Sequence, residues 1–298
     1  MGEDAPKSLT RGQKILRRTL VGGSIALVTA GLLYLVRGES GPLIVHGFAG
    51  LLLAGSTFEA SRMAQDARRA AWSLGSAAVV SWALVCVHLK EYLGESASPE
   101  LPISAFVQVI CASLLAATLT SAIALAATRS QQFVRGLRAD IGRALWFVPA
   151  LSGLALLHLE FGSAGLVSLI VLSKVGDVLG YFGGSLFGKH HPLPKLSPGK
   201  TTEGFACSLL GGVGVGVALA HWGVLPGEEV GLASGALLGG VMNVAAQVGD
   251  LIESWVKRRA GVKDSGKLFG PTGGFLDLLD SFFVTVPVAL WIGLTGAA

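Results

Sequence analysis

Acidic side chains gather in two neighbouring stretches of a chain that is otherwise largely apolar. The stretch "KDSGKLFGPTGGFLDLLDS" (263–281) places Asp277 and Asp280 three residues apart at the start of the last apolar segment. A helix beginning there would present both carboxylates on one face. Upstream, "QVGDLIESWVKRR" (247–259) reads as a helix with Asp250 at the membrane edge and basic residues in its last turns. Carboxylates beside lysine and arginine are the side chains that bind metal ions and phosphates.

The clustered carboxylates have a structural and a chemical interpretation. Capping of a helix dipole is worth about 0.3–1 kcal/mol per carboxylate, but it does not account for Asp250 or for the lysines nearby. Carboxylates on two helices at one depth suit Mg²⁺ that is held by a few acids and by phosphate oxygens. Such an ion neutralises phosphate charge and polarises the phosphorus under attack. The pattern therefore predicts that the acids bind a metal ion and that this ion binds a nucleotide.

Two further polar stretches leave both interpretations open. In "LSKVGDVLGY" (172–181), Lys174 and Asp177 share one helix face inside an apolar segment, where each charge costs about 2.5–3.5 kcal/mol. Either the two charges neutralise each other so that the helix can insert into the membrane, or the pair forms one wall of a polar site. The loop "HPLPKLSPGKTTEG" (191–204) contains three prolines, so it cannot be one continuous helix. It is either an ordinary solvated loop or a contact for a phosphate or a lipid headgroup.

Long apolar segments must position these residues. Apolar residues make up 51% of the chain, charged residues only 14%, and the mean hydropathy is +0.63. Segments long enough to cross a bilayer recur from end to end, without the alternation of polar and apolar residues that a membrane barrel requires. The sequence predicts an all-α polytopic membrane protein with nine spans, at residues 20–36, 41–58, 70–88, 101–127, 141–159, 163–187, 204–225, 229–252 and 275–296.

The distribution of basic residues predicts how these spans are oriented. With the N-terminus in the cytoplasm, 20 of the 23 lysines and arginines fall on the cytoplasmic side of the nine-span arrangement. This asymmetry places the C-terminus outside. The expected location is a multi-pass position in a bacterial inner membrane. Within one span, Gly180, Gly184 and Gly188 follow each other at intervals of four, which predicts close helix packing.

Four segments together resemble the phosphatidate cytidylyltransferases (CDP-diacylglycerol synthases). They are "DVLGYFGGSLFGK", "SPGKTTEG", "GDLIESWVKRRAGVKDSG" and "GGFLDLLDS". The match covers roughly the last 130 residues, whereas residues 1–145 resemble the family only in being hydrophobic and helical. The resemblance implies N-terminal transmembrane helices and loops over 1–145 and a catalytic transmembrane region with a cytosol-facing acidic site over 146–298.

The family resemblance also implies a reaction and roles for individual residues. CTP and phosphatidic acid would give CDP-diacylglycerol and pyrophosphate, with Mg²⁺ and a second cation as cofactors. The partners implied are these two substrates and the bilayer, with a homodimer left open and no nucleic acid. Asp250 and Asp277 match the metal-binding acids of the family. The acidic pocket would be completed by Asp177, Asp264 and Asp280. The phosphates would be contacted by Lys200, Lys257, Arg258 and Lys263. The side that faces the lipid headgroup would be lined by Ser197, Thr201 and Glu203.

The chain departs from the family signature at two positions. Thr272 stands where the signature has histidine, and Leu278 stands where it has arginine. An arginine beside a metal-site acid can pair with carboxylate or phosphate, so another cation is expected here, and Lys267 is the candidate. Two alternatives stay open: a CTP-dependent lipid enzyme with another acceptor, such as a polyprenol- or phytol-type kinase, and a transporter of anionic lipids.

Overall fold

The computed structural model describes residues 27, 30–31, 33–38, 40–64, 66–94, 103–128, 133–227, 230–270 and 273–295. Within these ranges the regular structure is helical and contains no strand. The helices are α2 (Gly41–Arg62), α3 (Ala67–Gly94), α4 (Ile103–Ala127), α5 (Phe133–Phe187), α6 (Thr202–His221), α7 (Leu232–Arg259), α8 (Phe275–Leu279) and α9 (Phe282–Thr295). Seven helical segments of the described chain are long and apolar enough to cross a membrane. The prediction of an all-α polytopic membrane protein is confirmed.

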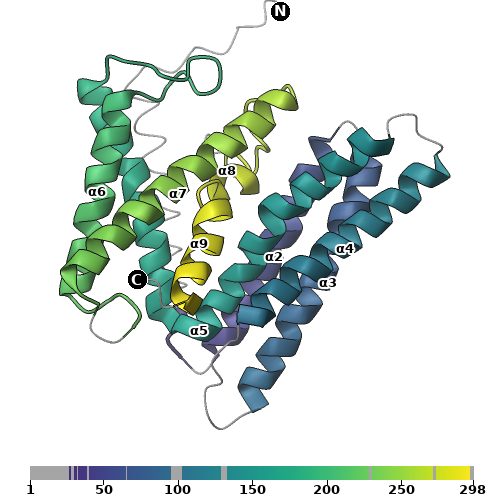
Figure 1. Ribbon diagram of the computed structural model, residues 1–298, viewed down its shortest axis with the longest axis horizontal. Helices are drawn as coiled ribbons and strands as arrows, with labels where there is room; N and C mark the ends of the chain where they lie inside the picture. The colour runs from purple at the N-terminus through teal and green to yellow at the C-terminus, as the bar shows by residue number, and fades with distance from the viewer. Residues whose placement is uncertain are drawn as a thin grey trace, which may run out of the picture.

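Helix α5 accounts for two of the predicted spans. It runs over 55 residues and is interrupted at Gly162, where φ is +59° and ψ is −157°. A residue with a side chain rarely adopts this backbone conformation, so glycine permits the sharp turn. Figure 1 shows the two arms of α5 forming a V, with the second arm returning toward the long loop at 188–201. Spans 141–159 and 163–187 therefore correspond to the two arms.

The remaining spans agree with the structure to within seven residues at either end, apart from the first span. Span 20–36 lies mainly outside the described residues, so the count of nine stays a prediction. The last span is present as Phe275–Gly293, within which the chain turns at Asp280 and Ser281 between the short helix α8 and helix α9. The proposed boundary at residue 145 falls inside helix α5.

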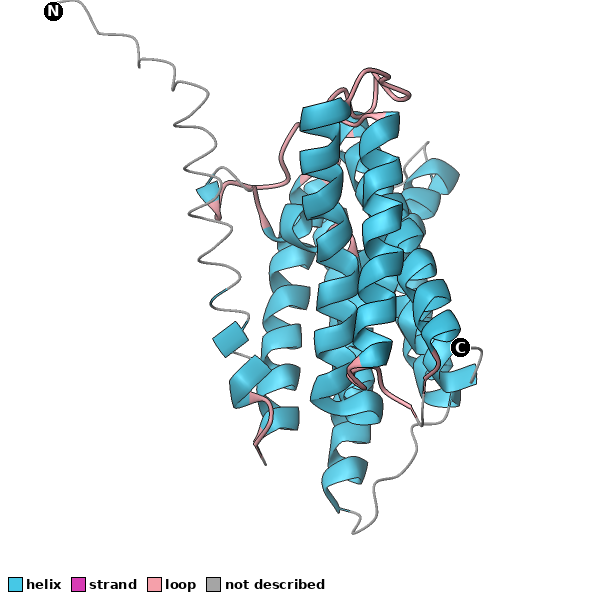
Figure 2. Cartoon of the chain, turned by 90° about the vertical axis from the view of Figure 1, so that its left-hand side faces the viewer, coloured by secondary structure: helices cyan, strands magenta, loops and turns pink. Residues whose placement is uncertain are grey.

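The helices run roughly parallel, and their ends define two faces of the molecule (Figures 1 and 2). The loop 188–201, the C-terminal end of α7 and helix α8 lie at one end, whereas α9 runs toward the other. The first end carries the basic residues that follow α7 and those of the 188–201 loop. This arrangement agrees with the predicted alternation of the last spans, and by the positive-inside rule the basic end would face the cytoplasm.

Glycines bring α5, α6 and α7 into close contact. A Cβ atom at Gly180 or Gly184 would press on α6 at Ser208 or at Thr201, and one at Gly216 would overlap the backbone of Gly235 on α7. The close packing expected at Gly180 and Gly184 is thereby confirmed, whereas Gly188 lies just beyond the end of α5. The close approach of the three helices brings the polar side chains near their ends to one cavity.

Candidate functional site

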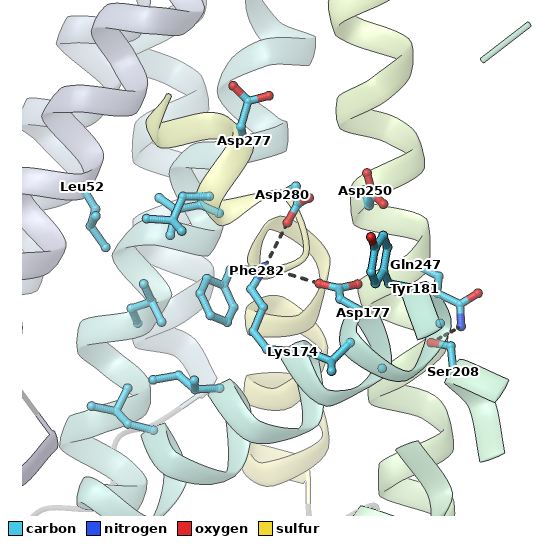
Figure 3. A pocket seen from close by; sticks show the side chains of 18 of the residues that line it. Leu52, Lys174, Asp177, Tyr181, Ser208, Gln247, Asp250, Asp277, Asp280 and Phe282 are labelled. Atoms are coloured by element: carbon cyan, nitrogen blue, oxygen red, sulfur yellow. Dashed lines mark hydrogen bonds and ion pairs between the residues drawn. The ribbon is translucent and has the colours of Figure 1, made fainter. Parts of the chain in front are cut away.

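A cavity of about 1020 Å³ opens between helices α2, α5, α6, α7 and α8. One wall is apolar and is formed by α2 and α5, for example by Ile44, Phe48, Leu52 and Ile170. The opposite side is polar. It is lined by Lys174, Asp177, Lys200, Thr201, Asp250, Asp277 and Asp280, several of which are labelled in Figure 3. One cavity therefore joins a hydrocarbon-like wall to a cluster of acids and lysines.

Lys174 on α5 links two of the carboxylates. Its Nζ lies 3.1 Å from Oδ1 of Asp280 and 3.5 Å from Oδ2 of Asp177. The ammonium also lies 5.3 Å from the ring centroid of Phe282, a cation–π distance. Asp177 interacts electrostatically with both Asp280 and Asp250. Lys174 and Asp177 therefore belong to a polar site that includes residues far apart in the sequence, rather than forming an isolated self-neutralising pair.

Asp250 on α7 is paired with the loop that precedes α6. Lys200 Nζ lies 2.5 Å from Asp250 Oδ2 and 5.5 Å from the ring centroid of Phe205. The next residue, Thr201, begins α6 because its hydroxyl accepts a hydrogen bond from the Gly204 backbone N–H at 3.1 Å. The helix cap thus fixes Lys200 at the mouth of the cavity. The other oxygen of Asp250 has only a long contact of 3.5 Å from the Ser254 hydroxyl.

Asp277 on α8 is anchored on all sides. Lys257 Nζ lies 2.6 Å from its Oδ1, and Oδ2 accepts hydrogen bonds from the backbone N–H of Ser265 at 2.7 Å and of Gly274 at 2.9 Å. Lys257 also pairs at 2.6 Å with Glu253, one turn earlier on α7. The Glu253 side chain is only 1% exposed. Asp277 and Asp280 were expected on one helix face, but they take different partners: Asp277 pairs with Lys257 and Asp280 with Lys174, and Asp280 lies at the C-cap of α8.

Glu59, on α2, was not among the predicted site residues. It is buried, and its Oε2 accepts hydrogen bonds from the Ser265 hydroxyl at 2.8 Å and from the Leu276 backbone N–H at 3.1 Å. A Cβ atom at Gly266 or Gly274 would overlap the Glu59 carboxylate, so these glycines allow the loop to close over it. An acid at the cytosolic end of an otherwise apolar helix in residues 1–145 is the sequence signal that could have found it.

Replacement of Glu59 by alanine should loosen the loop that carries Asp277. The buried N–H of Leu276 would lose its acceptor, a change that costs about 1–3 kcal/mol. We expect Glu59→Ala to lower both the thermal unfolding midpoint and turnover, and a cysteine introduced at Lys267 to react faster with a water-soluble maleimide. Glu59→Gln keeps an acceptor oxygen and should retain most of both properties. Equal behaviour of the alanine and glutamine variants would contradict this role.

Six predicted site residues do not line the cavity, among them Lys257, which is held beside it by its ion pair with Asp277. Arg258 is exposed in the last turn of α7 and donates a hydrogen bond to the Val262 carbonyl at 3.2 Å, and Lys263 and Asp264 are exposed beyond the end of the helix. Glu203 accepts hydrogen bonds from the backbone N–H groups of Lys189 and His190 and contacts the His190 ring, so it closes the base of the 188–201 loop. Ser197 lies within that loop, outside the cavity wall. Their substrate contacts stay predictions.

The donor chemistry of the cavity suits a hard cation. Among the described residues, no group of three or more acidic, histidine or cysteine side chains is arranged to hold a metal by itself. Mg²⁺, however, is commonly held by only one or two carboxylates, with phosphate oxygens and waters completing the octahedron. Asp250 retains an oxygen with only a long contact, and Asp177 and Asp280 line the same cavity, whereas both oxygens of Asp277 already have partners. The residues present therefore fit a magnesium ion that arrives with a phosphate ligand.

Comparisons with known proteins agree with this chemistry. The model of the cytidylyltransferase family matches residues 16–294. A protein of Mycobacterium leprae named phosphatidate cytidylyltransferase is 39% identical over 173 residues, which cover 58% of this chain and 54% of the relative. A protein with the same name from Mycobacterium bovis is 38% identical over 165 residues, which cover 55% of this chain and 52% of the relative. Another from Aquifex aeolicus is 37% identical over 145 residues, which cover 48% of this chain and 53% of the relative. The chain thus spans about half the length of the curated relatives it matches.

Proposed function

Because the chain belongs to the cytidylyltransferase family, we propose that it is a phosphatidate cytidylyltransferase, which forms CDP-diacylglycerol and pyrophosphate from CTP and phosphatidic acid. The observation that carries the proposal is the cavity with two unlike walls. A phospholipid requires an apolar surface for its acyl chains, and a nucleotide triphosphate requires cations and a metal-binding carboxylate. Both requirements are met within one cavity at the basic end of the molecule.

The proposed reaction is a direct transfer between two phosphates. A phosphate oxygen of phosphatidic acid attacks the α-phosphorus of CTP, a new phosphoanhydride bond forms, and the bond to the β-phosphate breaks to release pyrophosphate. Bound Mg²⁺ would supply charge neutralisation and polarisation at that phosphorus. Asp250 is proposed to hold it through its weakly bonded oxygen, and Asp277 by exchanging its Lys257 partner for the ion. A second cation stays part of the proposal.

The protein's own residues position the two substrates. The wall formed by Ile44, Phe48 and Leu52 on α2 faces the lipid chains. Lys200 lies at the mouth of the cavity, where its ammonium can exchange Asp250 for a phosphate oxygen. Lys257 holds Asp277 in place through its 2.6 Å ion pair. The lysines therefore organise the carboxylates before substrate binds, and those at the mouth can neutralise phosphate afterwards.

The proposed location is a bacterial inner membrane with the site open to the cytosol. Its support is that basic residues gather at the end where the cavity lysine Lys200 and the 188–201 loop lie. CTP carries several negative charges and does not cross a bilayer unaided. A cytosol-facing site is therefore the arrangement in which both substrates are available.

Product analysis in oriented vesicles tests the proposal. Inverted inner-membrane vesicles containing the protein should convert labelled CTP and phosphatidic acid into CDP-diacylglycerol and pyrophosphate, and chelation of Mg²⁺ should stop the reaction. Sealed right-side-out vesicles should be inactive until they are permeabilised. Release of CDP in place of pyrophosphate would identify a lipid kinase. Absence of any CTP-dependent product from several lipid acceptors would contradict an enzyme of this class.

A further inference from the structure

We propose that Lys174 positions the acids of the cavity. It supplies the positive charge that arginine provides in the family signature at the position of Leu278. The expected effect of Lys174 on CTP binding rests on the proposed function. The balance of charge between Lys174 and the acids does not, because it is a property of the folded chain. Lys174 lies within the second arm of α5, a membrane-spanning segment, and contacts two acids of the cavity wall. A lysine at such depth is costly unless it has partners, and intramembrane ionisable residues are therefore expected to be functional.

The ion pairs of the cavity assign each acid to one lysine. Asp250 pairs with Lys200, and Asp277 pairs with Lys257. Both Asp280 and Asp177 depend on Lys174, which is their cationic partner among the contacts of the described residues. Without Lys174, Asp280 would keep, within the described part of the chain, only the hydrogen bond from the Ser281 backbone N–H, and Asp177 only a longer-range interaction with Lys200. Such carboxylates repel one another and would repel the phosphates of an incoming nucleotide.

Leu278 lines the same cavity between the two aspartates Asp277 and Asp280. An aliphatic side chain there adds no charge to a wall that contains four acids. A guanidinium at position 278 would extend into the space that these acids surround and could pair with Asp280. The ammonium of Lys174 reaches Asp280 from α5 instead, at 3.1 Å. The same charge therefore enters the cavity from a different helix.

Lys267, which the sequence suggested for this role, lies elsewhere. It is exposed in the loop before α8 and is not part of the cavity wall. The Lys174 side chain, by contrast, is 34% exposed and its Nζ lies within ion-pair distance of two acids. The hypothesis that Lys267 compensates for Leu278 is thus replaced by one in which the compensating cation is already in contact with the acids.

A charge-relocation experiment tests the proposal without substrate. Lys174→Met should lower the thermal unfolding midpoint of the detergent-purified protein by several degrees, because Asp280 and Asp177 lose their counter-ion. Lys174→Arg should restore most of the midpoint. The double variant Lys174→Met/Leu278→Arg should also recover part of it, whereas Leu278→Arg alone should bring no gain. Lys195→Met, which removes an exposed lysine of the 188–201 loop, controls for loss of charge in general.

Kinetics separate a positioning role from a purely structural one. Loss of one cation near the nucleotide should raise KM for CTP about tenfold in the protein that remains folded, and Leu278→Arg should reverse part of this rise. The proposal is overturned if Lys174→Met matches the wild type in both midpoint and KM, or if Leu278→Arg rescues neither. It is equally overturned if Lys267→Ala, and not Lys174→Met, lowers the unfolding midpoint and raises KM for CTP. If the wild type does not use CTP, the proposed function fails, and the substrate-free midpoints still decide the role of Lys174.

Discussion

Replacement of either proposed metal ligand should abolish turnover while leaving the protein folded. We expect Asp250→Asn and Asp277→Asn each to lower kcat about 10³-fold, because loss of charge stabilisation at the reacting phosphorus is worth several kcal/mol. Asparagine keeps the size of each side chain and one acceptor oxygen, so the hydrogen bonds from Ser265 and Gly274 to position 277 can persist. The measurements are initial rates at saturating CTP and the apparent Mg²⁺ requirement.

The double variant decides whether the two acids act together. Residues that hold one ion lose their function as a unit, so Asp250→Asn/Asp277→Asn should be little worse than either single variant. Fully multiplicative losses would show that the two carboxylates work separately. Asp66→Asn is a suitable control, because Asp66 pairs with Arg69 outside the cavity, in a half-exposed ion pair. Unchanged kinetics in that variant would rule out a general effect of removing a carboxylate.

The architecture and the acids of the site follow from simple features of the sequence. Spans are visible because about 20 apolar residues are needed to cross a bilayer, and the structure shows helices at the expected positions from α2 onward. Asp177, Asp250 and Asp280 stand out because charges are rare within apolar helices, and the structure places all three in one cavity. A single unusual residue in an apolar segment is thus a strong local signal.

Pairings between distant residues could not be predicted in this way. Glu59 precedes Ser265 by 206 positions, and Lys174 precedes Asp280 by 106. Which lysine meets which acid depends on helix packing, and here on the close approach allowed by Gly180, Gly184 and Gly204. The break at Asp280 was missed for a related reason. The apolar residues of α8 and α9 form one hydrophobic run, and the turn between them coincides with the ion pair of Asp280 to Lys174, which the sequence does not reveal.

Removal of Lys257 should damage the fold more than the loss of Lys174 or Lys200, the two lysines that line the cavity. Its side chain is only 12% exposed, and its Nζ lies 2.6 Å from both Glu253 and Asp277. Breaking a buried pair by removing one partner costs about 3–5 kcal/mol, because the remaining charge is left uncompensated. Lys257→Met should therefore sharply reduce the yield of folded protein and the unfolding midpoint. Both are measurable in detergent by size-exclusion chromatography and a thermal unfolding assay.

A second substitution separates the structural role of Lys257 from its catalytic one. Glu253, at 1% exposure, bears most of the cost when Lys257 is lost, whereas Asp277 still accepts hydrogen bonds from Ser265 and Gly274. Lys257→Met/Glu253→Gln should accordingly regain most of the folded yield, since a neutral amide is far cheaper to bury than an unpaired carboxylate. Turnover should stay low, because Asp277 still lacks the cation that orients it. A double variant no more stable than Lys257→Met would contradict this account, and full recovery of turnover would show that Lys257 serves the fold alone.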